Sequence, residues 1–267
     1  MAERLHYLHP QTRQVLRLAQ QLTDKAIRLR EVDHLEGEVN ALLRHPTRAG
    51  RPFEIVYRSG QDDVLDHLIA HEVGHVVRLY RVPEAERHLA MVQPAHRERA
   101  ARQLLTEVPD ALWQLSPTKL ADLFIDWHQN VATQVANFPA DLRIEQWIHD
   151  RYRGLRSVQE RSLLREVARN EPLFHPLVRR LTPPTIYQAT MAMNAAQAWH
   201  MSQLYVRPQL MDPFALNRFS DVGKVLAEMV FTASDDGHRS DMVASDIWAA
   251  ALGLSGWFSW QSYRQMR

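Results

Sequence analysis

The chain has no cysteine among its 267 residues. This absence excludes disulfide bonds, thiolate nucleophiles and cysteine-bound zinc, and leaves histidine and carboxylate side chains as the available metal ligands. No stretch approaches the roughly 20 apolar residues that a membrane-spanning helix needs, and the first residues lack the apolar segment of a secretory signal. We therefore expect a cytoplasmic protein with no membrane partner.

An excess of charge of one sign is also missing. Lysine and arginine together number 32, against 31 for aspartate and glutamate. This balance gives no long-range field that would attract nucleic acid, so none is expected as a partner. Hydrophobic residues make up 45% of the chain, which is enough to fill a sizeable core.

Apolar residues at helical spacing predict a helix from Pro10 to about Arg44, either continuous or broken near Gly37. The string "FEIVY" at 53–57 alternates and is rich in aromatic and β-branched residues, which predicts a short strand. A second helix is expected directly after this strand, from about Gln61 to Tyr80.

The rest of the chain continues in helical patterns. Helices are expected over 84–108, over 117–137 with Ser116 as the cap, and from Pro139 onward, with later breaks at 182–185, 207–214 and 234–241. The fold class is therefore mainly α, with a small edge strand or sheet before the second helix. We expect a catalytic region over 1–170 and a helical C-terminal region over 171–267, packed into the same domain.

The second predicted helix contains "LIAHEVGHVVRLY" at 68–80. His71 and His75 are one helical turn apart, so both imidazoles can reach one metal ion at about 2.0 to 2.1 Å. Glu72 lies about 100° further round the helix, where it can reach a water on the metal without becoming a ligand. A zinc ion there would lower the pKa of that water toward about 7, and Glu72 would act as the general base.

The context of these residues argues against a chance match. Apolar residues flank the histidines on both sides of the helix, and buried histidines without partners would cost several kcal/mol. A metal removes that cost. Gly74 costs a helix about 1 kcal/mol relative to alanine, which predicts a close neighbour at this point.

His71, Glu72 and His75 match the H-E-x-x-H signature of the zincin metallopeptidases, which the chain therefore resembles. The resemblance implies a zincin-like fold, Zn²⁺ as the cofactor and hydrolysis of peptide bonds in a protein or peptide substrate. The order of "FEIVY" and then the helix is similar to that of zincins, in which an edge strand pairs with an extended substrate. The metzincin subclass is excluded because Arg78 and Arg81 stand where it requires glycine and histidine.

A third ligand must come from elsewhere. In "NFPADLRIEQWIHDRY", Asn137, Asp141 and Glu145 share one helix face, and the string is similar to a helix of metallopeptidases associated with von Willebrand factor A domains. The position along the helix favours Asp141 as the ligand. The longer side chain of Glu145 favours that residue instead, because it reaches a neighbouring helix more easily. We keep both, with a slight preference for Glu145. Glu98 is a weaker candidate because its surroundings are charged, unlike the pattern in small regulatory metallopeptidases.

Several side chains are candidates to stabilise a developing oxyanion: His149, Tyr152, Tyr187 and His200. His238 lies in a polar loop that is either a lid or a turn, and the sequence does not rank these residues. The alternative to an enzyme is a catalytically inactive zincin-like module that binds or senses, or a regulatory interaction protein.

Overall fold

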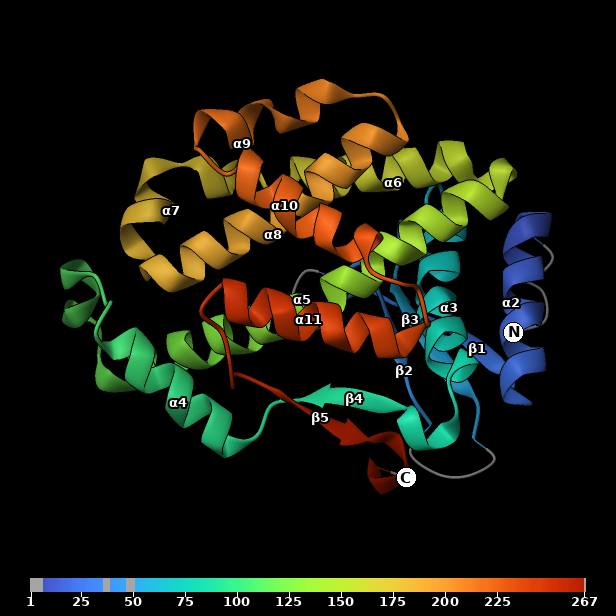
Figure 1. Cartoon of the computed structure of the whole chain (residues 1–267), viewed down its shortest axis with the longest axis horizontal. Coiled ribbons are helices and arrows are strands. Elements are labelled where there is room, and N and C mark those ends of the chain that lie inside the picture. Colours follow the sequence, from blue (N-terminus) through green and yellow to red (C-terminus); the bar gives the residue numbers. More distant parts are fainter. Residues whose placement is uncertain (1–6, 36–38, 47–50, 267) are drawn as a thin grey trace.

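The computed structural model describes residues 7–35, 39–46 and 51–266 and is mainly helical with small sheets, which confirms the predicted fold class (Figure 1). Gly37, where a helix break was considered, lies outside the described residues. Within the described ranges, none of the helices combines the length and the apolar character needed to cross a lipid bilayer.

The first described helix, α2 (Pro10–Thr23), ends much earlier than predicted. Asp24 adopts a left-handed conformation with φ 51°, and the chain then forms β1 (Ile27–Val32) and β2 (Ala41–Arg44). The prediction of a helix to Arg44 is therefore wrong. These strands are stabilised by pairing with a later segment, and the periodicity of their own sequence does not reveal that partner.

The later segment is β3 (Phe53–Arg58), the predicted strand. It lies in the middle of the sheet, parallel to β1 on one side and antiparallel to β2 on the other. The predicted position at the sheet edge is wrong, because four of its six side chains are buried, as suits a central strand. Among the described residues, β1 and β2 are the two edge strands of this sheet.

The helix α3 (Leu65–Arg81) follows and carries the HEVGH segment. The predicted helix over 84–108 is wrong in its first part, because residues 88–91 form β4 (His88–Met91) and α4 (Pro94–Leu105) begins at a proline. The strand β4 pairs with β5 (Ser259–Ser262), close to the other end of the described chain.

A single helix, α5 (Pro117–Arg151), replaces the two that were predicted, although its Ser116 cap is confirmed. Pro139 lies inside it and removes one backbone hydrogen bond. The prediction of a new helix at Pro139 is wrong because α3, α8 (Pro184–Leu204) and α11 (His238–Ala251) all pack against α5 and stabilise it as one helix.

Of the remaining helices, α6, α8, α10 and α11 pack against α5. A break lies near each of the three predicted positions, although α8, α9 and α11 each begin inside the predicted range. Figure 1 shows α8 beside α10, and α11 running along α5. These helices are α6 (Arg156–Ala168), α7 (Pro176–Leu181), α8 (Pro184–Leu204), α9 (Asp212–Leu216), α10 (Ser220–Thr232) and α11 (His238–Ala251). Short 3-10 helices are Glu84–Glu86, Asp110–Gln114, Arg153–Leu155, Glu171–Phe174, Pro208–Met211 and Tyr263–Met266.

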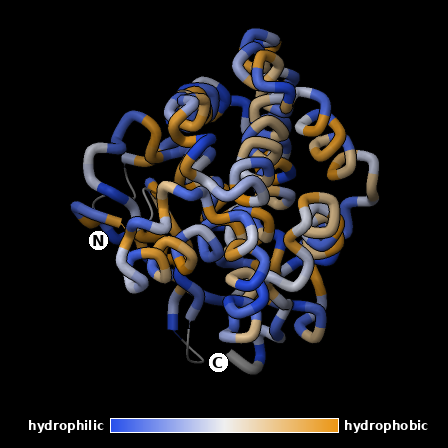
Figure 2. Tube along the Cα trace, turned by 90° about the vertical axis from the view of Figure 1, so that its left-hand side faces the viewer, coloured by the Kyte–Doolittle hydropathy of each residue, from blue (hydrophilic) through white to orange (hydrophobic). Residues whose placement is uncertain are grey.

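The helix α5 takes part in two hydrophobic cores. Its residues from Leu120 to Leu142 pack with α8, α10 and α11, whereas Ile144 and Ile148 pack with α2, α3 and β3. Hydrophobic and hydrophilic residues alternate along the helices in Figure 2, as expected when each helix buries one face. Asp141 lies where the two cores meet.

Gly74 sets how closely α3 and α5 approach each other. A Cβ atom added at Gly74 would lie 2.6 Å from Cγ2 of Ile144, and Ile144 is fully buried. The close neighbour predicted at Gly74 is therefore confirmed, and it belongs to α5.

We expect Gly74→Ala to lower the free energy of unfolding by about 1 to 3 kcal/mol, because overpacking outweighs the gain in helix propensity. Urea denaturation measures the change. Combining it with Ile144→Ala should cost less than the sum of the two single changes, since the second removes the clash. A stabilising Gly74→Ala would contradict the contact.

Candidate metal centre

One face of α3 carries three histidines and not two. They are His67, His71 and His75, spaced four residues apart. The ring centroids of His67 and His71 are 6.1 Å apart, and those of His71 and His75 are 5.0 Å apart. His67 is buried, whereas the other two are partly exposed to a pocket.

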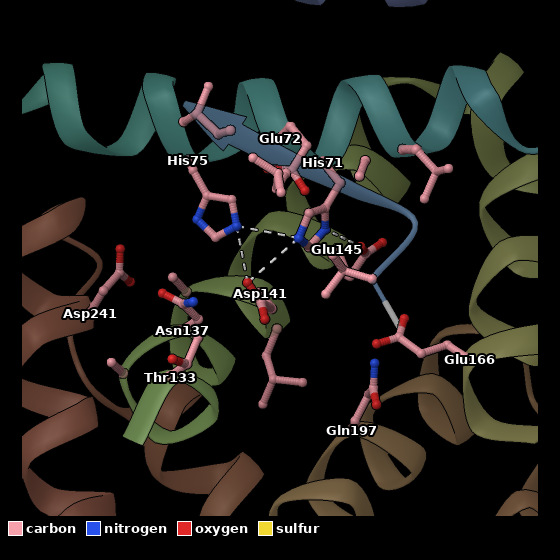
Figure 3. Close-up of a pocket in the computed structure, with 18 of the residues that line it drawn as sticks. His71, Glu72, His75, Thr133, Asn137, Asp141, Glu145, Glu166, Gln197 and Asp241 are labelled. Carbon is pink, nitrogen blue, oxygen red and sulfur yellow. Dashed lines mark hydrogen bonds and ion pairs between the residues drawn. The ribbon is translucent and has the colours of Figure 1, made fainter. Parts of the chain in front are cut away.

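Asp141 of α5 faces the last two histidines across this pocket (Figure 3). Its Oδ1 lies 3.2 Å from Nε2 of His75 and 3.5 Å from Nε2 of His71. The two Nε2 atoms are 3.3 Å apart. These three atoms therefore form a nearly equilateral triangle.

A zinc ion with tetrahedral bonds of about 2.0 to 2.1 Å has ligand atoms about 3.3 Å apart, so this triangle has the size that zinc requires. Asp141 Oδ1 is shielded from solvent and has no hydrogen bond of good geometry among the described residues. A cation at the centre of the triangle would satisfy this oxygen. The nitrogen and oxygen donors also suit zinc.

Glu145 has a different set of contacts. Its carboxylate accepts from Nδ1 of His71 at 2.7 Å, from Nε2 of His67 at 2.9 and 3.0 Å, and from Nε2 of Gln159 at 2.6 Å. Glu145 is only 4% exposed. Its oxygens are thus occupied by hydrogen bonds, and the bond to Nδ1 leaves Nε2 of His71 free to face Asp141.

The charges of this cluster are strongly coupled. Burial alone would lower the pKa of His71, but the contacts with Asp141 and Glu145 outweigh it and raise that pKa well above its usual value. Burial would likewise raise the pKa of Asp141 and of Glu145, yet the neighbouring histidines hold both below their usual values. Without a metal, a proton on His71 therefore balances the carboxylates, and a divalent cation would displace that proton.

The pocket has a volume of about 510 Å³, within the usual range of roughly 300 to 1,000 Å³ for ligand sites. Glu72 lines it beside His71 and His75, as Figure 3 shows. Residues 39–43, which include the start of β2, form part of another wall. The sequence-predicted residues of the site therefore meet at one cavity.

The other sequence candidates divide into two groups. His200 and His238 line the pocket. The described residues that line it do not include the other three candidates, His149, Tyr152 and Tyr187. Nε2 of His238 donates to the carbonyl of His88 at 2.6 Å, and burial lowers the pKa of His200 to about 4. Glu98 is exposed and lies 4.0 Å from Arg102 on the same helix, so it takes no part in this site.

Two residues of the cluster escaped the sequence analysis. His67 could have been found, because it extends the four-residue spacing of His71 and His75 by one turn toward the N-terminus. Gln159 gave no such signal, since α6 brings it to Glu145 only through tertiary packing.

A buried ion cluster supports one wall of the pocket. Arg78, at the end of α3, makes two hydrogen bonds of 2.6 Å to Asp241 of α11. It also donates to Asp235 at 2.7 Å, and Arg143 of α5 lies 3.4 Å from Asp241. Asp241 lines the pocket, so this cluster ties α11 to the helices that carry the site.

Removing Asp241 should destabilise the fold far more than removing Asp235. Asp241→Ala leaves the buried Arg78 and Arg143 with only the half-exposed Asp235 as an acidic partner, which should cost about 3 to 5 kcal/mol. Asp235 is 56% exposed at its side chain, so Asp235→Ala should cost at most about 1 kcal/mol. Chemical denaturation of both variants tests this, and equal losses would contradict the assignment of the buried pair.

Comparison of the chain with protein-family models, with curated proteins and with solved structures finds no match. Functional inference therefore rests on the geometry of the site and on the sequence motif.

Proposed function

We propose that this protein is a zinc-dependent metallopeptidase that hydrolyses peptide bonds in a protein or peptide substrate. One observation carries the proposal: His71, His75 and Asp141 hold three ligand atoms 3.2 to 3.5 Å apart, beside Glu72, in a pocket of substrate size. The resemblance of the HEVGH segment to the zincin signature supports the same conclusion.

The spacing favours Asp141 as the third ligand, whereas reach alone favoured Glu145. Asp141 Oδ1 lies near both Nε2 atoms, but the contacts of Glu145 are with Nδ1 of His71 and with His67. A 2.7 Å contact is a hydrogen-bond distance and is shorter than the roughly 3.3 Å between two ligand atoms of one zinc ion. Glu145 therefore acts as the partner that orients a ligand.

Glu145 performs this role by accepting the Nδ1 proton of His71. The hydrogen bond selects the tautomer that presents a bare Nε2 to the metal, and it keeps the ring in one orientation. His67 and Gln159 in turn hold the Glu145 carboxylate in place. This chain of buried hydrogen bonds prepares His71 for binding before an ion arrives.

Glu72 is the general base of the proposed reaction. A bound zinc ion supplies Lewis acidity, which makes a water easier to deprotonate and a carbonyl carbon easier to attack. The Glu72 carboxylate accepts the proton of the attacking water and passes it to the departing amine, so that the C–N bond breaks with a neutral leaving group.

The edge strand β2 is suited to bind the substrate backbone. Among the described residues it pairs with β3 on one side only, and residues 39–43 line the pocket. An extended peptide could add to its unpaired side and lie along the pocket. This is the role that the sequence analysis assigned to an edge strand, now transferred from β3 to β2.

Zinc content tests the ligand assignment. We expect one zinc per chain after loading with zinc and desalting, and its loss in His71→Ala, His75→Ala and Asp141→Ala. Glu145→Gln should keep zinc but bind it about 10- to 100-fold more weakly in a competition with a chelator. Glu98→Gln serves as the matched control and should be unchanged. Zinc retained by Asp141→Ala and lost from Glu145→Gln would reverse the two roles.

Peptide cleavage tests the role of Glu72. Glu72→Gln should retain zinc but lower the rate of cleavage of a proteome-derived peptide library by about 100- to 10,000-fold, because the general base is lost. Chelation of the wild-type protein should abolish cleavage, and added zinc should restore it. Equal cleavage by wild type and Glu72→Gln would refute the assigned base. Stoichiometric zinc with no cleavage by either would support the alternative, an inactive binding module.

A further inference from the structure

The pocket extends beyond the metal-ligand triangle to a second polar wall. Glu166 of α6 and Gln197 of α8 line this part, on the side opposite α3 (Figure 3). They are separate from the hydrogen-bond partners of Glu145 and from the three candidate ligands. The proposed hydrolysis makes no use of them.

Glu166 has an environment that a cation would improve. Its side chain is exposed where it lines the pocket. The protein packed around the carboxylate raises its pKa, and the charges of Glu145 and Asp141 add to this effect, whereas the contact with Gln197 and the charge of His71 oppose it. Among the described residues, no lysine or arginine forms an ion pair with it. Its partner is the Gln197 amide, a neutral group.

Gln197 is the second observation at this wall. It is only 7% exposed, and Figure 3 shows its amide directed at Glu166. Its Oε1 is buried and has no hydrogen-bond partner among the described residues. Gln197 therefore turns its amide nitrogen toward Glu166 and holds that carboxylate at the pocket wall, and the carboxylate keeps acceptor capacity for a positively charged group with several N–H donors.

We propose that Glu166 and Gln197 form a specificity subsite that binds the lysine or arginine side chain of an extended peptide substrate. A divalent metal ion is a poorer occupant, because a single carboxylate does not supply the set of oxygen ligands that such an ion needs. The subsite deepens the proposed peptidase function and rests on it for the identity of the ligand.

The test compares peptides that differ only in charge. Fluorescein-labelled, N-terminally blocked alanine hexapeptides carry one lysine at each position in turn, or norleucine, which has nearly the same length without the charge. Binding to zinc-loaded Glu72→Gln protein is followed by fluorescence anisotropy. The best lysine peptide should bind roughly five- to tenfold more tightly than its norleucine counterpart, and salt should reduce the difference.

Matched variants locate the effect. Glu166→Gln in the same background should bring the two affinities together, and Glu166→Lys should favour a peptide with glutamate at that position. Glu171→Gln removes a nearby exposed carboxylate outside the pocket lining and should leave the lysine preference intact. Thermal unfolding of each variant identifies any loss of fold.

The outcomes separate this proposal from the peptidase proposal. Equal affinity for lysine and norleucine peptides, or a lysine preference that survives Glu166→Gln, overturns the subsite even if wild type cleaves peptides. Failure to bind any of the peptides also overturns it. A lysine preference that depends on Glu166, without cleavage by wild type, supports the subsite and refutes the peptidase.

Discussion

The close crossing of α3 and α5 is the constraint on which the whole site depends. The contact between Gly74 and Ile144 brings the two helix backbones together, and the four-residue spacing on each helix then aligns His67, His71 and His75 with Asp141 and Glu145. A bulkier residue at position 74 would hold the two sets of side chains apart. The glycine therefore shapes the candidate metal centre as much as the histidines do.

The sequence predicted which side chains come together at the pocket because their spacing on each helix is regular. His71, Glu72 and His75 lie within one turn, and Asp141 and Glu145 are again one turn apart, so both helix faces could be predicted from the chain alone. The choice between the two carboxylates could not, because it depends on how far one helix is displaced along the other. The strands β1, β2 and β4 were missed for a related reason: each is stabilised by a partner distant in sequence, and Pro139 stays helical only because other helices pack around it.

The polar groups of the centre are arranged in layers around His71. Asp141 faces its Nε2, Glu145 holds its Nδ1, and His67 and Gln159 surround Glu145 in the buried interior. A buried polar network of this kind stabilises the fold only when its hydrogen bonds are formed. Removing one member leaves its neighbours without a partner and frees the His71 ring to change orientation. The network also lies on α5, which contributes residues to both hydrophobic cores and so ties the site to each of them.

The pairing of β4 with β5 has a consequence for how the protein reaches its working form. Trp260 of β5 and Leu89 and Ala90 of β4 line the same pocket as the histidines, so two segments from distant parts of the chain complete one wall. Contacts of such high sequence separation form late, because the loop between them must first be ordered. The helices that carry the site can assemble earlier, but the cavity closes only when β5 has docked. A peptidase built in this way would complete its pocket as one of the last steps of folding, which would delay cleavage until the fold is nearly complete.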